Sequence, residues 1–150
     1  MENNLPILVQ KYGGSSLATS KQISTIAKRI AEKYQQGNKV VVIVSAMGKT
    51  TDELIELANS ITKDPSPREL DLLLSTGELI SCTLMAMAIK SLGFNAISLS
   101  GAQAGIQTDT RHGKAKISGI NPDRIKNELD KNNIVIIAGF QGVTDEMDTT

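Results

Sequence analysis

Residues 40–44 read Val-Val-Val-Ile-Val and run directly into Ser45-Ala46-Met47-Gly48. An unbroken run of β-branched residues is typical of a strand buried on both faces, as in a parallel sheet covered by helices on either side. Residues 134–138 form a second wholly apolar run, which ends in Gly139-Phe140-Gln141-Gly142. These two runs predict the centre of a parallel sheet.

Helical patterns alternate with the strand patterns along the chain. Thr19 and Gln22 have capping-box spacing before a helical pattern that stops near Gly37, and Thr50 and Glu53 repeat that spacing before a second helix. We expect strands at 5–10, 40–44, 94–99 and 134–138, further helices at 68–92 (bent near 75–77) and from Asn121, and a hairpin within 108–118. The alternation predicts an α/β domain with a mainly parallel sheet and helices on both faces.

The composition is that of one ordinary globular domain. The chain has 150 residues, of which 40% are hydrophobic and 21% charged. Lys plus Arg and Asp plus Glu number 16 each, and this zero net charge argues against nucleic acid and anionic membranes as partners. Residues 1–4 lack the basic start of a secretory signal, and no apolar run approaches the roughly 20 residues of a spanning helix. Only one cysteine is present, and we expect a cytoplasmic protein.

Four polar or glycine-rich segments follow the expected strands: Lys11–Ser16, Ser45–Thr51, Ser100–Gln103 and Gly139–Gly142. In an open α/β sheet, ligands bind beyond the carboxyl ends of the strands. We therefore expect these segments to converge on a binding site.

The first of these segments has the features of a phosphate site. Gly13 and Gly14 permit a tight turn and close approach of a ligand to the backbone. The amides after them would lie at a helix N-terminus, where an anion gains about 0.3–1 kcal/mol from the helix dipole. Lys11 adds a full positive charge. A phosphate fits all three features, and so does a plain strand-to-helix turn with a surface lysine.

The second segment contains a misleading motif. Residues 48–50, Gly-Lys-Thr, look like the end of a Walker A loop, but that motif requires a glycine at position 43, which is Ile43. The hydroxyls of Ser45, Thr50 and Thr51 at a helix start would suit a carboxylate. Simple capping of the helix by Thr50 is the alternative.

Three other residues have side chains that could take part in binding or catalysis. Glu78 lies in an apolar helical stretch, where a buried carboxylate is costly unless a lysine or the amine of a ligand pairs with it. A bend at Gly77 would instead expose it. We expect Cys82 to be a small core residue and His112, beside Arg111, to be a solvated surface residue.

Taken together, five segments resemble the signature motifs of aspartate kinases, in order and at the family's spacing. They are Val9–Ser16, Val44–Leu54, Leu73–Glu78, Ser100–Gly105 and Ala138–Val143. The resemblance implies the amino acid kinase fold, an αβα sandwich around a mainly parallel sheet. It also implies site roles: Lys11 as the catalytic lysine that neutralises phosphate charge, Gly13, Gly14 and Ser15 as the ATP phosphate loop, and Ser45, Thr51 and Glu78 as substrate-binding residues. Glu78 is expected to face the α-amine of aspartate.

The implied activity is transfer of the γ-phosphoryl group of ATP, with Mg²⁺, to the side-chain carboxylate of L-aspartate. The product, 4-phospho-L-aspartate, begins the biosynthesis of lysine, threonine and methionine. Members of the family continue with a Gly-Arg-Gly-Gly-Ser-Asp segment, the nucleotide-binding half and a pair of ACT regulatory domains. None of these occurs in residues 1–150. We therefore expect the N-terminal part of a catalytic domain, inactive alone, from a full-length protein that forms a homo-oligomer.

Other functions remain open. A related kinase acting on acetylglutamate or a nucleoside monophosphate would share the fold, and a non-catalytic substrate-binding or assembly module would share the front half of it. A dinucleotide-binding dehydrogenase domain is disfavoured because no G-x-G-x-x-G follows the first strand.

Overall fold

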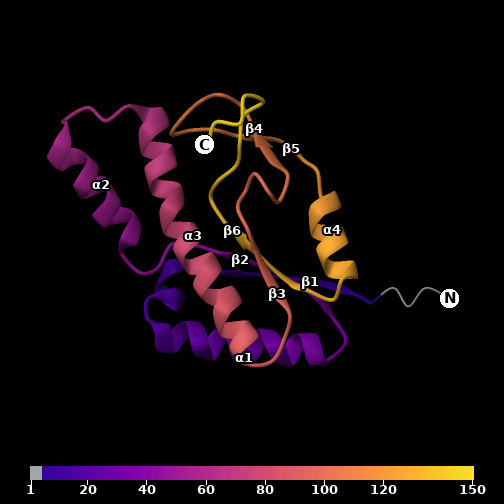
Figure 1. Ribbon diagram of the computed structural model, residues 1–150. Helices are drawn as coiled ribbons and strands as arrows, with labels where there is room; N and C mark the ends of the chain where they lie inside the picture. Colours follow the sequence, from indigo (N-terminus) through magenta and orange to yellow (C-terminus); the bar gives the residue numbers. More distant parts are fainter. Residues whose placement is uncertain (1–4) are drawn as a thin grey trace.

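The central sheet has four parallel strands in the order β1-β2-β6-β3 (Figure 1). The computed structural model describes residues 5–150, so residues 1–4, on which the prediction about a secretory signal rests, lie outside the described part. The strands are β1 Ile7–Tyr12, β2 Lys39–Val44, β3 Ala96–Leu99 and β6 Ile134–Ala138. Every pairing within this sheet is parallel. The predicted α/β class with a parallel sheet is confirmed.

The two most apolar strands, β2 and β6, lie side by side at the centre. All five residues of β6 are buried, as are four of the six in β2. One face of the sheet is covered by α1 (Ser20–Gln35) and α3 (Pro67–Ser91). The core on this side comprises Leu17, Ile23, Ile26, Ala27, Ile30, Val40, Val42, Val44, Cys82, Met85, Ala86, Ile89, Ala96, Ile134, Ile136 and Ala138.

The opposite face is covered by α4 (Asp123–Asp130) and by a hairpin of β4 (Ile106–Thr108) and β5 (Ile117–Ile120). These two strands pair antiparallel, so the predicted hairpin is confirmed. A smaller core forms here from Val41, Leu99, Ala104, Leu129, Val135 and Ile137. Helices therefore lie on both faces, while α2 (Thr50–Ile61) lies beside α3 and has no fully buried residue (Figure 1).

The structure confirms the predicted capping box at the start of α1 but differs from the sequence predictions at the start of α2 and at the turn after β1. The Thr19 side chain accepts a hydrogen bond from the Gln22 N–H, and the Gln22 side chain accepts one from the Thr19 N–H, which completes the predicted capping box. Thr50 does not cap α2, because Lys49 occupies the cap position and no side chain bonds there. The glycines after β1 lead into a short 3₁₀ helix, η1 (Gly14–Leu17), and α1 begins only at Ser20.

Helix α3 is the longest element and shapes the site described below. Its 25 residues are long and apolar enough, by length and composition alone, to cross a bilayer. In the fold it packs on the sheet instead and buries the polar residues Ser75, Glu78 and Ser81, as a core helix does. The helix continues without a break through 75–77, where the sequence predicts a bend.

The capping box at α1 gives a direct test of the fold. Replacing Thr19 by alanine leaves the Gln22 N–H without its side-chain acceptor, so we expect the free energy of unfolding to fall by about 1 kcal/mol in a urea titration. Thr25→Ala is the matched control, because that exposed hydroxyl bonds only to the Lys21 carbonyl within its own helix. Equal losses from the two variants would show that the box does not stabilise the helix start.

Candidate active site

A pocket of about 360 Å³ opens at the carboxyl ends of β1, β2 and β6. Three of the four predicted segments contribute to it, together with the middle of α3. Its lining residues are Lys11, Gly14, Ile43, Ser45, Ala46, Gly48, Thr51, Glu78, Gly139 and Phe140. The fourth segment, Ser100–Gln103, stays outside the lining and instead holds the last loop through a 3.2 Å hydrogen bond from the Gly101 N–H to the Gln141 side chain.

Five of the seven predicted site residues line this pocket: Lys11, Gly14, Ser45, Thr51 and Glu78. Gly13 and Ser15 flank the lining residue Gly14 but do not line the pocket themselves. Residues far apart in sequence thus meet at one edge of the sheet.

Lys11 is the basic group of the pocket. It lies within β1, with an exposed side chain, and pairs in register with Ile43 of β2. A Cβ added to Gly13 would lie 3.8 Å from Lys11 Nζ, so the ammonium group lies close to the glycine turn. Within residues 5–150, Lys11 forms no ion pair.

Two glycines allow the backbone to close around Ala46 on the pocket wall. A Cβ at Gly14 would lie 2.6 Å from the Ala46 carbonyl oxygen, and a Cβ at Gly77 would lie 3.0 Å from the Ala46 Cβ. A side chain at Gly14 would therefore collide with the Ala46 backbone, and one at Gly77 would push α3 away from the loop. The Gly48 N–H also donates to the Gly14 carbonyl at 2.9 Å, which fixes the first two loops to each other.

Glu78 is the acidic group of the pocket. Only 6% of the residue is exposed, so the prediction of a buried carboxylate is confirmed and the alternative of exposure at a bend is wrong. Its Oε1 accepts a 3.3 Å hydrogen bond from the Ala46 N–H. No cation pairs with it among residues 5–150, and burial raises the pKa of its carboxyl group. One turn on, the Ser81 hydroxyl donates to the Ser45 carbonyl at 2.6 Å and ties α3 to the same loop.

Sequence reasoning missed Phe140, which also lines the pocket. The residue is 94% exposed and has a φ of 56°, in the left-handed region. Such a conformation costs a non-glycine residue about 1–2 kcal/mol. The available signal in the sequence was an aromatic residue in a short segment bounded by Gly139 and Gly142. A strained, exposed ring at the rim of a pocket is a candidate ligand contact.

Cys82 and His112 lie outside the pocket lining. Cys82 is 1% exposed, its Sγ lies 3.4 Å from the Ile136 carbonyl oxygen, and burial raises its pKa to about 11, which confirms a core role.

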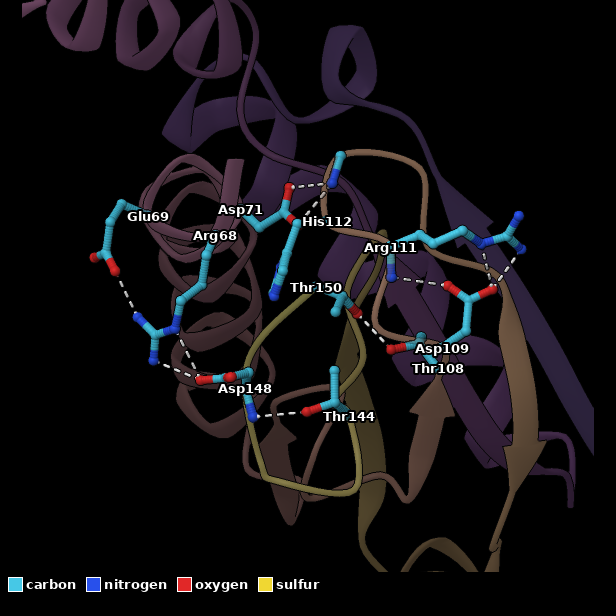
Figure 2. Close-up of polar contacts among 11 residues, drawn as sticks. Arg68, Glu69, Asp71, Thr108, Asp109, Arg111, His112, Thr144, Asp148 and Thr150 are labelled. Carbon is cyan, nitrogen blue, oxygen red and sulfur yellow. Dashed lines mark hydrogen bonds and ion pairs between the residues drawn. The ribbon is translucent and has the colours of Figure 1, made fainter. Parts of the chain in front are cut away.

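The prediction that His112 is a solvated surface residue is wrong. The β4–β5 loop folds onto the first turns of α3, and His112 Nδ1 lies 3.0 Å from Oδ2 of Asp71, with 19% of its side chain exposed (Figure 2). The Gly113 N–H donates to the same carboxylate, and Arg68 on the same helix pairs with Asp148 (Figure 2). These contacts fix the hairpin and the last residues to α3.

Comparisons with known proteins agree with this architecture. The model of the amino acid kinase family matches residues 6–149. The aspartokinase of Geobacillus stearothermophilus is 53% identical over 144 residues, which make up 96% of this chain and 35% of that protein. The chain therefore spans about a third of the length of the curated relatives it matches.

Two solved structures share the fold. The crystal structure of aspartate kinase from Synechocystis superposes with a TM-score of 0.79 at 43% identity, covering 97% of this chain and 24% of that one. E. coli aspartokinase III, in complex with aspartate and ADP, superposes with a TM-score of 0.82 at 20% identity, covering 97% and 43%. With the parallel sheet, the pocket at its carboxyl edge and the family match across 6–149, these findings show that the chain belongs to the amino acid kinase family.

Proposed function

We propose that this chain is the N-terminal part of the catalytic domain of an aspartate kinase, which transfers the γ-phosphoryl group of ATP to the side-chain carboxylate of L-aspartate. The observation that carries the proposal is a pocket that holds both Lys11 and Glu78, neither of which has a counter-ion in the described residues. A phosphate of ATP beside Lys11 and the ammonium group of aspartate beside Glu78 would satisfy both. The two relatives at 53% and 43% identity carry the names aspartokinase and aspartate kinase.

Glu78 suits the α-amine of an amino acid. Its carboxylate is buried and receives one hydrogen bond from a backbone amide, which leaves most of its acceptor capacity for a ligand. An ammonium group there would favour the ionised form that burial disfavours. The hydroxyls of Ser45 and Thr51 line the same pocket and would complete the substrate side.

This charge pattern also separates aspartate from the alternative substrates. The nitrogen of acetylglutamate is acylated and carries no positive charge, and a nucleoside monophosphate has no aliphatic amine. Either ligand would leave Glu78 buried and unpaired, a costly arrangement. The structure thus favours an amino acid with a free amine.

Lys11 suits the phosphate side. Its exposed ammonium group, close to the Gly13 turn, would bind the phosphates that the loop of Gly13, Gly14 and Ser15 holds. The backbone at Gly14 lies in contact with the Ala46 loop, so the glycine turn is positioned before a ligand binds. Such preorganised positive charge acts most strongly where negative charge meets in the transition state.

In the proposed reaction, a carboxylate oxygen of aspartate attacks the γ-phosphorus of ATP. The bond from that phosphorus to the bridging oxygen breaks, its electron pair stays with ADP, and the new bond forms 4-phospho-L-aspartate. The attacking carboxylate is already ionised at neutral pH, so no general base is required. The barrier is the approach of two anions, which Lys11 would lower.

Mg²⁺ is the expected companion of ATP. The described residues contain no group of three or more His, Cys, Asp or Glu side chains placed to hold a metal ion. When bound with the nucleotide, the ion would supply further positive charge to offset the negative charge of the phosphates.

The remaining features of the full-length protein are also proposals. The relatives are about three times as long, and we propose that the further length supplies the nucleotide-binding half and the ACT regulatory domains. On this proposal residues 1–150 alone do not catalyse phosphoryl transfer. The full protein is a cytoplasmic homo-oligomer that acts in lysine, threonine and methionine biosynthesis.

The buried carboxylate predicts a pH-dependent stability. Glu78 is protonated in both states below its ordinary pKa of about 4.5, and the native state loses stability as the pH rises through the raised pKa of the folded protein. Glu78→Gln keeps the Ala46 hydrogen bond without the charge. We expect urea titrations to show a stability advantage of the variant at about pH 7 that shrinks by about pH 4. An advantage that does not change with pH would contradict an uncompensated charge at this position.

Turnover tests the activity itself. We expect a form extended past Thr150, as the relatives are, to release ADP in the presence of L-aspartate and to form an acyl phosphate that hydroxylamine traps. Lys11→Ala should lower kcat/KM by about 100-fold or more, because it removes a preorganised charge at the phosphates. Lys49→Ala is the matched control, since Lys49 follows the same edge of the sheet but does not line the pocket. Turnover with acetylglutamate or a nucleoside monophosphate in place of aspartate would contradict the proposal.

A further inference from the structure

The segment Ser100–Gln103 follows β3 but does not line the pocket, so the proposed function gives it no role. It forms a closed turn. The Ser100 N–H donates to Gln103 Oε1 at 3.0 Å, and the Gln103 N–H donates to Ser100 Oγ at 3.2 Å. This reciprocal pair is the arrangement of a capping box, which fixes the turn by its own side chains. The turn is therefore a firm support for whatever packs against it.

Gln141, the neighbour of the rim residue Phe140, packs against this turn. The Gly101 N–H donates to Gln141 Oε1 at 3.2 Å. A Cβ added to Gly101 would lie 2.3 Å from the Gln141 carbonyl oxygen, so the two backbones come this close only because position 101 is a glycine. On its other side, Gln141 Nε2 donates to the Ser75 carbonyl of α3 at 3.1 Å. One side-chain amide thus uses its acceptor and a donor to bridge the turn and α3.

The conformation of Phe140 depends on its two neighbours. Its φ of 56° lies in the left-handed region, and its ring is 94% exposed, so packing of the ring does not hold it there. On one side the Gly139 N–H donates to the Val44 carbonyl at 2.9 Å, and on the other side the Gln141 bridge fixes the chain. A strained conformation persists only where its surroundings enforce it. Without the bridge, the backbone at Phe140 is free to relax and to move the rim of the pocket.

The bridge joins the rim to the acidic side of the pocket. Ser75 lies three residues before Glu78, on the same buried face of α3. The glycine turn on the phosphate side is held separately, through the hydrogen bond from the Gly48 N–H to the Gly14 carbonyl. A shift of the rim would therefore change the space beside Glu78 and leave the phosphate side in place.

We propose that Gln141 is a positioning residue for the amino acid substrate, and that the Ser100–Gln103 turn is the support against which it acts. This role rests on the proposed function, in which the amine of aspartate binds beside Glu78. Gln141 does not itself line the pocket, whereas Gly139 and Phe140 do. It acts through these two residues, by setting how far the rim stands from Glu78.

Steady-state kinetics of a form extended past Thr150 test this role. Gln141→Leu removes both side-chain hydrogen bonds, so we expect the KM for L-aspartate to rise about 5-fold or more and the KM for ATP to change less than about 2-fold. A variant that only lost stability would give less active enzyme, which lowers the apparent kcat and leaves both KM values unchanged. Gln35→Leu is the matched control, because Gln35 is an exposed glutamine at the end of α1.

Gly101→Ala disturbs the same contact from the opposite side. The added Cβ would collide with the Gln141 carbonyl oxygen, so we expect the KM for aspartate to rise again. The double variant should be no worse than the more damaging single one, because both changes break one bridge. An aspartate KM that Gln141→Leu leaves unchanged would overturn the positioning role and leave the proposed function intact. Absence of aspartate-dependent turnover in the unmodified extended form would instead overturn the proposed function, and this role with it.

NMR of the 150-residue chain tests the bridge without any turnover. We expect the backbone amide of Phe140 to have an order parameter of about 0.85 in the unmodified chain, and Gln141→Leu to lower it to about 0.6 or to shift the Phe140 Cα resonance as φ relaxes. Gln35→Leu should change neither quantity. An order parameter and a Cα shift that both stay the same in Gln141→Leu would show that the bridge does not hold the rim, and would overturn the positioning role whatever the kinetics give.

Discussion

The site depends on the close packing of three segments around Ala46. The turn after β1 approaches its carbonyl oxygen because position 14 has no side chain, and α3 approaches its Cβ because position 77 has none. The Ala46 N–H then donates to Glu78, so the packing that joins the segments also aims the carboxylate into the pocket. A larger residue at Gly14 or Gly77 would separate the loop from its neighbours and alter both charged sides of the pocket together.

The consequence is a pocket whose opposite charges do not neutralise each other. Lys11 enters from β1 and Glu78 from α3, and neither forms an ion pair with any residue from 5 to 150. Burial without a partner raises the pKa of Glu78 and lowers the stability of the empty protein. Natural proteins keep such groups where a ligand completes the pair. Two substrates, one that brings phosphates to Lys11 and one that brings an ammonium group to Glu78, match this arrangement, which is the physical basis of the aspartate kinase proposal.

Periodicity and residue type were sufficient for most of the fold. The β-branched run in β2 and the apolar run in β6 predicted a parallel sheet, and the Thr19 and Gln22 pair predicted how α1 begins. Local sequence patterns gave wrong predictions where contacts between residues distant in sequence determine the structure. We predicted a solvated His112 because no neighbouring residue in the sequence indicates that Asp71 lies against it. We predicted Thr50 as the cap of α2, but the helix begins at Thr50 and Lys49 occupies the cap position. The strain and exposure of Phe140 depend on a backbone angle that no sequence pattern specified.

The most direct test of the account is an NMR titration of the Glu78 side-chain carboxyl with and without L-aspartate. We expect the pKa of this carboxyl group to lie above the ordinary glutamate value of about 4.5 in the free chain, and to fall when the ammonium group of aspartate binds. The Glu78→Gln variant identifies the resonance. An ordinary pKa in the free chain, or a raised pKa that saturating aspartate leaves unchanged, would contradict the claim that Glu78 is the receptor for the substrate amine.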